Sequence, residues 1–273
     1  MKIGKKYFDF TEKSYVMGIL NVTPDSFSDG GKYQDSDLAL QRAGQMIREG
    51  AAIIDVGGES TRPGHEEISS EEELKRVIPV IRAIKDHYDI PISLDTSKYV
   101  VAREGIEAGA DMINDIWGLR KDEGQMAELL AKKQIPCCLM HNRVTDDYSD
   151  SADFLSGFMA DVEQILAIAD RAGIRREHII LDPGIGFGKN QKQNLMVMNH
   201  LSILQRFKLP ILLGTSRKSM IGNVLRLPAD SRQEGTLATT VIGRMAGVSV
   251  FRVHDVLPNV RALMMTDAII KES

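Results

Sequence analysis

The 273-residue sequence predicts an α/β protein with a closed (β/α)8 barrel of the TIM type. Eight short apolar segments alternate with helical patterns, and such alternation is typical of right-handed parallel strand–helix units. Eight units in a chain of about 250 residues favour a closed barrel, with a doubly wound open sheet as the alternative. No linker or low-complexity segment interrupts the chain. We therefore expect one barrel domain over 15–270, with residues 1–14 as an N-terminal segment that caps the barrel bottom.

The eight expected strands are nearly continuous apolar runs, as in strands that are covered on both faces of a parallel sheet. They span 15–22, 51–58, 90–95, 110–116, 135–141, 178–183, 209–215 and 248–254. The two cysteines of the chain, Cys137 and Cys138, are neighbours in one of these runs. Adjacent strand residues point to opposite faces, so we expect two buried free thiols and no disulfide.

Helical patterns occupy the segments between the strands. Residues 70–86 place apolar side chains on one face, and Ser69 with Glu72 fits a capping box at the start. Pro79 lies inside this pattern, which predicts either a kink or a helix that starts later. Residues 152–172 form a second strong pattern. The remaining helices are expected over 36–49, 97–108, 123–133, 191–207, 231–247 and 258–270.

Composition and charge exclude several classes of protein. An apolar content of 43% and a charged content of 26% exclude a disordered or collagen-like chain. The net charge of −4 provides no bulk field for nucleic acid or an anionic membrane. The first residues are too polar for a signal peptide, and no run of about 18 apolar residues occurs. We expect a cytoplasmic protein with neither nucleic acid nor membrane as a partner.

Polar side chains end every expected strand, and a (β/α)8 barrel carries its chemistry at these carboxyl ends. Arg252 and His254 alternate on the last strand, so they face the same way and favour an anion site. The whole set favours a polar ligand at one mouth. Its members are Asn21, Asp55 with Glu59, Asp95, Asn114 with Asp115, His141 with Asn142, Asp182, Thr215 with Ser216, and Arg252 with His254.

Two long loops follow the first two strands, over residues 21–31 and 57–64. Both exceed the usual βα connection of about two to six residues, which favours lids over the mouth. The glycine-rich run GIGFGK (184–189) fits neither the dinucleotide-binding nor the P-loop spacing. His141 has no companion at metal-ligand spacing, which favours a structural or hydrogen-bonding role.

Seven sequence blocks between about residue 15 and residue 267 resemble the dihydropteroate synthase family. The blocks are GILNVTPDSFSDGG (18–31), DVGGESTRPG (55–64), PISLDTSK (91–98), MINDIWG (112–118), LDPGIGFGK (181–189), LLGTSRKS (212–219) and RVHDV (252–256). The resemblance implies a (β/α)8 barrel, in agreement with the strand count. It also implies a transferase of folate biosynthesis that condenses 6-hydroxymethyl-7,8-dihydropterin diphosphate with p-aminobenzoate, giving 7,8-dihydropteroate and pyrophosphate. A homodimer and inhibition by sulfonamides are further implications.

The resemblance assigns roles to individual residues by motif. Asn21 resembles a ligand of Mg²⁺, an ion that fills most of its octahedron with water and substrate oxygens. The implied diphosphate site comprises Thr61, Arg62, Arg252, Val253 and His254. The implied pterin pocket comprises Asp95, Asn114, Asp182 and Lys218, and the implied p-aminobenzoate site comprises Phe27, Pro63, Phe187 and Ser219. The implied catalytic residues are Asp29, Lys218, Arg252 and His254.

The implied chemistry needs no protein nucleophile, because diphosphate is a good leaving group once its charge is held. It is a dissociative displacement in which Asp29 lies near a cationic pterin and the protein contributes positioning and electrostatics. One alternative is a pterin-binding methyltransferase domain with a corrinoid partner, which would not need the diphosphate and lid motifs. A folate-binding module without catalysis would not need Asn21. A Schiff-base aldolase with Lys218 as nucleophile would be detected by borohydride trapping.

Overall fold

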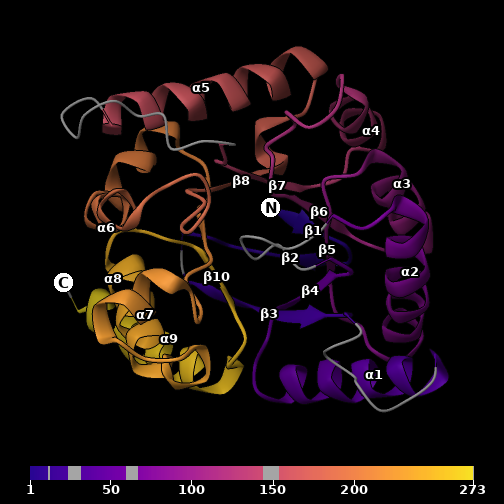
Figure 1. Cartoon of the computed structure of the whole chain (residues 1–273), viewed down its shortest axis with the longest axis horizontal. Coiled ribbons are helices and arrows are strands. Elements are labelled where there is room, and N and C mark those ends of the chain that lie inside the picture. The colour runs from indigo at the N-terminus through magenta and orange to yellow at the C-terminus, as the bar shows by residue number, and fades with distance from the viewer. Residues whose placement is uncertain (12, 24–31, 60–66, 144–153, 273) are drawn as a thin grey trace.

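In a computed structural model of the chain, eight parallel strands form a barrel that is ringed by helices (Figure 1). The structure describes all residues except 12, 24–31, 60–66, 144–153 and 273. The strand order is β8–β7–β6–β5–β4–β3–β10–β9, and a parallel bridge between Leu181 and Ile211 joins its two ends. The predicted (β/α)8 barrel is therefore confirmed, and the open doubly wound sheet is wrong.

The barrel strands lie within the eight predicted apolar runs, each shortened at one or both ends. Apolar runs overestimate strand length because residues outside the ladder are buried too, such as Ile90 before β5 and Ala110 before β6. The strands are β3 (Tyr15–Asn21), β4 (Ile53–Gly57), β5 (Ile92–Asp95), β6 (Met112–Asp115), β7 (Cys137–Met140), β8 (Ile179–Asp182), β9 (Leu212–Leu213) and β10 (Val250–Val253).

The helices of the described residues cover the outside of the barrel (Figure 1). The predicted helix over 191–207 is wrong in its second half, because Leu201–Phe207 is a 3-10 helix. The seven-residue helix α7 was not predicted, since it is too short to show a helical period. None of these helices is both long and apolar enough to cross a membrane. They are α1 (Lys32–Arg48), α2 (Ser70–His87), α3 (Tyr99–Ala108), α4 (Gln125–Lys133), α5 (Phe154–Ala172), α6 (Gln191–Asn199), α7 (Ser219–Leu225), α8 (Gln233–Met245) and α9 (Val256–Lys271).

Helix α2 includes Pro79, so the predicted later start is wrong. The proline removes a hydrogen bond to the carbonyl of Lys75, and both residues lie on the exposed side of the helix. Water can therefore replace the missing N–H donor. At the start of the helix, the Oγ of Ser69 accepts a hydrogen bond from the backbone N of Glu72 at 3.1 Å, as half of the expected capping box requires.

Side chains of the barrel strands alternate between two apolar clusters. Outward-facing residues pack beneath the helices in the larger outer cluster, which contains Cys137. Inward-facing residues near the amino ends of the strands form a smaller cluster with Cys138. The two cysteines thus lie on opposite sides of β7, as predicted, and both are free and buried. The strand residues of this inner cluster are Met17, Ile53, Met112, Cys138, Ile180, Leu212 and Val250.

The N-terminal hairpin packs against the inner cluster. Its strands β1 (Lys2–Ile3) and β2 (Lys6–Tyr7) pair antiparallel, and Ile3 and Phe8 belong to the same apolar cluster as the inward-facing strand residues. The ring of Phe8 also makes an edge contact with Tyr15, with 4.8 Å between centroids. These apolar contacts fill the interior at the amino ends of the strands, opposite the predicted site.

The packing of Phe8 predicts a large loss of stability for Phe8→Ala. The substitution leaves a cavity beside the inner cluster, and truncation of a buried Phe costs about 3–5 kcal/mol. Urea denaturation measures this loss as a change in the free energy of unfolding. The matched control is Tyr7→Ala, since Tyr7 is 76% exposed. A Phe8→Ala loss no larger than that of the control would contradict the proposed packing.

Candidate active site

Polar side chains replace apolar ones in the barrel interior above the inner cluster. Four of them stand two residues beyond an inner-cluster residue on the same strand, and side chains two apart on a strand face the same way. These pairs are Ile53 with Asp55, Met112 with Asn114, Ile180 with Asp182, and Val250 with Arg252. Strand β5 adds Ser93 and Asp95, which are buried like Asp55, Asn114 and Asp182. The register of the sheet thus builds a polar pocket in the middle of the barrel.

The guanidinium of Arg252 lies between two carboxylates of this pocket. Its Nε donates to Asp55 Oδ2 at 2.6 Å, and its Nη2 donates to Asp95 Oδ2 at 2.6 Å. Burial opposes the charge of Arg252, but the two carboxylates outweigh burial and raise the pKa of Arg252 above its ordinary value. Burial also raises the pKa of Asp95 to about 7, against the opposing effect of Arg252. Among the described groups, the charge of Arg252 is therefore what favours the ionised form of the Asp95 carboxylate.

Four buried polar atoms of the pocket have no hydrogen-bond partner among the described residues. They are Asp55 Oδ1, Ser93 Oγ, Asp95 Oδ1 and Asn114 Oδ1. Buried polar atoms are nearly always hydrogen-bonded in folded proteins, so this set calls for a ligand. Three of the atoms can accept but are not donors, and a hydroxyl oxygen can accept as well. The pocket is therefore suited to a flat ligand edge that carries several N–H donors.

Lys218 and Phe187 form the side of the pocket near β8 and β9. The Nζ of Lys218 donates to the carbonyl oxygen of Ile185 and lies 4.6 Å from the centroid of the Phe187 ring. Burial lowers the pKa of Lys218 to about 8, although the Asp182 carboxylate opposes the shift. Burial raises the pKa of Asp182, whose Oδ1 accepts a hydrogen bond from Gly184 N at 2.7 Å. An aromatic face and a cation thus lie side by side at this edge.

His254 lies one inward-facing position above Arg252, nearer the mouth. Its Nδ1 is 3.0 Å from Ser216 Oγ, and its backbone N donates to the same oxygen at 3.2 Å. The neighbouring turns are joined by a bidentate ion pair between Arg217 and Asp255, with N–O distances of 2.6 and 3.0 Å. These contacts fix the imidazole at the rim, where a bound anion could reach it.

Asn21 lies half-buried at the end of β3, beside Gly57. A Cβ atom added to Gly57 would be 3.7 Å from Asn21 Oδ1 and 3.7 Å from Asp95 Oδ2, so both oxygens face the same small space. Within the described residues, no group of three His, Cys, Asp or Glu side chains could hold a metal ion. This arrangement does not fit a metal caged by protein alone. It fits a magnesium ion that takes most of its ligands from water and phosphate.

The structure brings most of the predicted site residues together. Ser219 begins helix α7 directly after Lys218 and is exposed. The predicted pterin residues Asp95, Asn114, Asp182 and Lys218 share the pocket, with Arg252 among them. Asn21 and His254 lie at the rim. The predicted residues Phe27, Asp29, Thr61, Arg62 and Pro63 lie outside the described residues.

The side chain of Val253 does not face the pocket, so a substrate contact of this residue would have to come from its backbone. It alternates with the inward-facing Arg252 and His254, so its side chain packs in the outer cluster beneath the helices. Conversely, Asp55 was recognised only as a polar strand end, with no role in the site. Ser93 was missed, although its position two residues before Asp95 on one strand could have revealed it.

Comparisons with known proteins agree with this geometry. Residues 17–254 match the model of the pterin binding enzyme family. Dihydropteroate synthase from Clostridium beijerinckii is 56% identical over 272 residues, covering 99% of this chain and 100% of that protein. Dihydropteroate synthase from Clostridium difficile, crystallised in the presence of pteroic acid, aligns with a TM-score of 0.93 and 50% identity, covering 96% of this chain and 99% of that one.

A second solved structure, the Yersinia pestis dihydropteroate synthase in a sulfonamide drug complex, aligns with a TM-score of 0.91 and 42% identity over 99% of both chains. The similarity thus extends over nearly the whole chain in sequence and in fold. It includes the strands that carry the polar pocket. From its sequence and its fold alike, this chain belongs to the dihydropteroate synthase family of pterin-binding transferases.

Proposed function

We propose that the polar pocket holds the pterin ring of 6-hydroxymethyl-7,8-dihydropterin diphosphate while p-aminobenzoate binds at the mouth. The observation that carries this proposal is the set of four unpartnered buried atoms. A pterin edge presents an amino group and ring N–H donors, and the oxygens of Asp95 and Asn114 can accept hydrogen bonds from them. Lys218 can donate to the ring acceptors. Hydrogen bonds to charged groups are stronger than those between neutral groups. A ring without matching donors would leave the buried pocket atoms unpaired and would therefore bind more weakly.

The diphosphate is proposed to lie above the ring, within reach of His254 and of Arg252. Arg252 uses Nε and Nη2 for Asp55 and Asp95, and a guanidinium has five N–H donors, so further donors remain for an anion. Thr61 and Arg62 are proposed to add contacts from the loop after β4. Asn21 would hold Mg²⁺, which when bound supplies positive charge to the leaving diphosphate.

The proposed reaction is a dissociative displacement. The bond between the pterin methylene carbon and the diphosphate oxygen breaks, and its electron pair leaves with pyrophosphate. The amine of p-aminobenzoate then attacks the cationic pterin and loses a proton. When Asp55, Asp95 and Asp182 are ionised, their three negative charges exceed the two positive charges of Lys218 and Arg252. A pocket with this net negative charge stabilises a cation by fixed electrostatics.

The proposed p-aminobenzoate site lies beside Phe187 and Ser219, next to the charge of Lys218. Phe27 and Pro63 are proposed to complete it, and Asp29 to lie near the cation. Sulfonamides are proposed to occupy the same place as inhibitors, which the Yersinia pestis drug complex supports. The cytoplasm is the proposed location, since two free buried thiols suit a reducing compartment.

A homodimer is proposed through helices α7, α8 and α9, which lie together near the C-terminus (Figure 1). Exposed apolar patches mark interaction surfaces, and a second copy of this chain is the proposed partner. Met245 and Met264 are 70% and 68% exposed. The other exposed apolar side chains of these helices are Val224, Leu225, Ile242, Leu257, Met265 and Ile269.

The proposed function predicts pyrophosphate release that requires the pterin diphosphate, p-aminobenzoate and Mg²⁺ together. A coupled assay on the purified chain measures this release, and each single omission should reduce it to background. Removal of Mg²⁺ by EDTA should abolish turnover, and added Mg²⁺ should restore it. Folded protein that releases no pyrophosphate with all three present would contradict the proposal. A pterin methyltransferase domain would give that negative result.

The pKa of Asp95, raised by burial to about 7, predicts pH-dependent binding of 6-hydroxymethylpterin. An ionised Asp95 accepts hydrogen bonds from the ring donors, so affinity should rise between pH 6 and pH 8. Asp95→Asn should weaken binding by about tenfold or more, since a hydrogen bond to a charged group contributes roughly 1.5–3 kcal/mol. It should also flatten the pH dependence. Isothermal titration calorimetry measures both effects.

The control for this titration is Asp86→Asn, because Asp86 is an exposed carboxylate on α2. This variant should keep the affinity and the pH dependence of the parent chain. If Asp95→Asn retained the rise between pH 6 and pH 8, another group would be responsible. The proposed role of the Asp95 carboxylate would then be wrong.

The proposed dimer predicts a solution mass of about twice the 30.3 kDa of the chain. Light scattering after size exclusion measures this mass. Met245→Glu places a charge in the apolar patch on α8 and should shift the protein towards the monomer. Leu195→Glu, at a 43% exposed position on α6, is the control and should leave the mass unchanged. A monomeric parent chain at micromolar concentration would exclude this interface.

A further inference from the structure

The glycine-rich run 184–189 forms a tight turn that packs on the residues after β7. Gly184 and Gly188 have φ values of +65° and +54°, which side chains other than glycine rarely adopt. A Cβ atom on Gly184 would lie 1.9 Å from the carbonyl oxygen of His141. One on Gly188 would lie 2.6 Å from the carbonyl oxygen of Arg143. Close backbone contact explains these glycines without a phosphate ligand.

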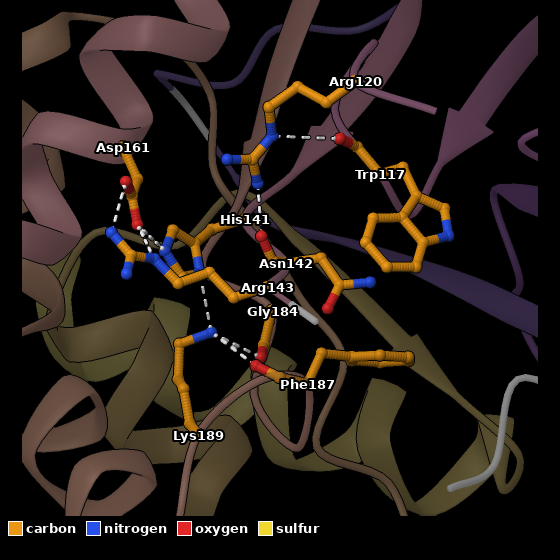
Figure 2. A network of polar contacts seen from close by, with 9 residues as sticks. All are labelled: Trp117, Arg120, His141, Asn142, Arg143, Asp161, Gly184, Phe187 and Lys189. Atoms are coloured by element: carbon orange, nitrogen blue, oxygen red, sulfur yellow. Dashed lines mark hydrogen bonds and ion pairs between the residues drawn. The ribbon is translucent and has the colours of Figure 1, made fainter. Parts of the chain in front are cut away.

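Lys189 connects this turn to His141, as Figure 2 shows. Its Nζ donates to the carbonyl oxygens of Gly184 at 2.9 Å and Phe187 at 3.0 Å, and it lies 2.8 Å from His141 Nδ1. An ammonium group has three N–H donors, so these three acceptors use all of them. Burial lowers the pKa of Lys189 to about 7, while the charge of Asp182 opposes the shift.

Asp161 and Lys189 contact the two ring nitrogens of His141 (Figure 2) and together fix the tautomer of the imidazole. Its Nε2 lies 2.9 Å from Asp161 Oδ2, and Asp161 also receives two N–H groups of Arg143 at 2.6 and 2.8 Å. An ionised carboxylate only accepts, so His141 Nε2 carries the hydrogen and Nδ1 accepts from Lys189. Burial lowers the pKa of His141 to about 4, which favours this neutral form.

The turn has other attachments, and among the described residues the Phe187 carbonyl is the one that depends on Lys189 alone. Gly186 N donates to Asn194 Oδ1 at 2.6 Å, and the Ile185 carbonyl accepts from Lys218. The Gly184 carbonyl accepts from Phe187 N at 3.1 Å as well as from Lys189, whereas the one donor to the Phe187 carbonyl among the described residues is Lys189. Without Lys189, the backbone that carries the Phe187 ring would lose two of the hydrogen bonds that fix it against Lys218.

We infer that Lys189, held by His141 and Asp161, is a positioning residue that fixes Phe187 at the p-aminobenzoate end of the site. It acts through the Phe187 ring and contacts neither substrate. The inference rests on the proposed placement of p-aminobenzoate beside Phe187. It gives the network of Figure 2 a role in the binding of p-aminobenzoate.

The test is Lys189→Met, which removes the three donors and keeps an unbranched apolar stem. The KM for p-aminobenzoate should rise about tenfold or more, the size expected for lost charged hydrogen bonds. The KM for the pterin diphosphate should rise much less, because no hydrogen bond of Lys189 reaches a pterin-pocket side chain and only its charge acts on Asp182. The matched control is Lys192→Met, an exposed lysine three residues further on α6, which should change neither constant.

A double-mutant cycle tests whether Lys189 acts through Phe187. Phe187→Ala should itself raise the KM for p-aminobenzoate, and adding Lys189→Met should raise it by less than about twofold more, because coupled residues are not additive. His141→Asn keeps an acceptor near the Nδ1 position and should preserve the KM. His141→Leu removes that acceptor and should behave like Lys189→Met, so these two variants serve if Lys189→Met fails to fold.

The outcomes separate this inference from the proposed function. A parent chain without pyrophosphate release would contradict the proposed function itself. An active parent with a selective rise in the KM for p-aminobenzoate supports the positioning role. Equal rises in both KM values, or independent effects of Lys189→Met and Phe187→Ala, would overturn it.

Discussion

Two carboxylates in the middle of the barrel need a charged partner, and the guanidinium of Arg252 forms an ion pair with both. Asp55 is fully buried and Asp95 nearly so, and an unpaired charge at such depth costs several kcal/mol. Arg252 reaches both with Nε and Nη2, each at 2.6 Å. It makes no hydrogen bond to their second oxygens, which are therefore available to a ligand. The ion pair stabilises the two buried carboxylates and at the same time leaves one oxygen of each without a hydrogen-bond partner.

The strand register makes this arrangement possible. Along β10, Val250 belongs to the inner cluster, Arg252 to the pocket and His254 to the rim, while Val253 faces the helices. A shift of one residue would put the guanidinium under the helices and a valine between the two carboxylates. The apolar floor, the polar middle and the rim that carries His254 are therefore successive layers of one alternating pattern.

The sequence predicted the strands well, because burial on both faces produces local apolar runs. It predicted Asp95, Asn114, Asp182 and Arg252 as site residues because each ends or nearly ends such a run. The role of Asp55 depends on Arg252, which is 197 residues away, and no local pattern shows this contact.

The network around Lys189 depended on tertiary contacts in the same way. Asp161 interrupts the apolar face of helix α5, and its partners His141 and Arg143 come from the end of β7. Helix α2 continues through Pro79 because water can replace the missing donor, and hydrophobic periodicity does not measure solvation. Helix α7 is too short to show a helical period. Patterns along the chain thus located the site. The ion pairs and hydrogen bonds between its side chains became visible only in the folded structure.

The hairpin that places Ile3 and Phe8 on the inner cluster has a kinetic consequence. Within the described residues, the hairpin covers the barrel interior at the amino ends of the strands, so exchange is expected at their carboxyl ends. The group that lies deepest must enter first and leave last, since anything seated nearer the opening obstructs it. The layer of Asp95 and Asn114 lies below that of His254, so the placement proposed for the pterin would set the order of arrival and departure by depth in the barrel. Such an order would need no direct communication between the two proposed substrates.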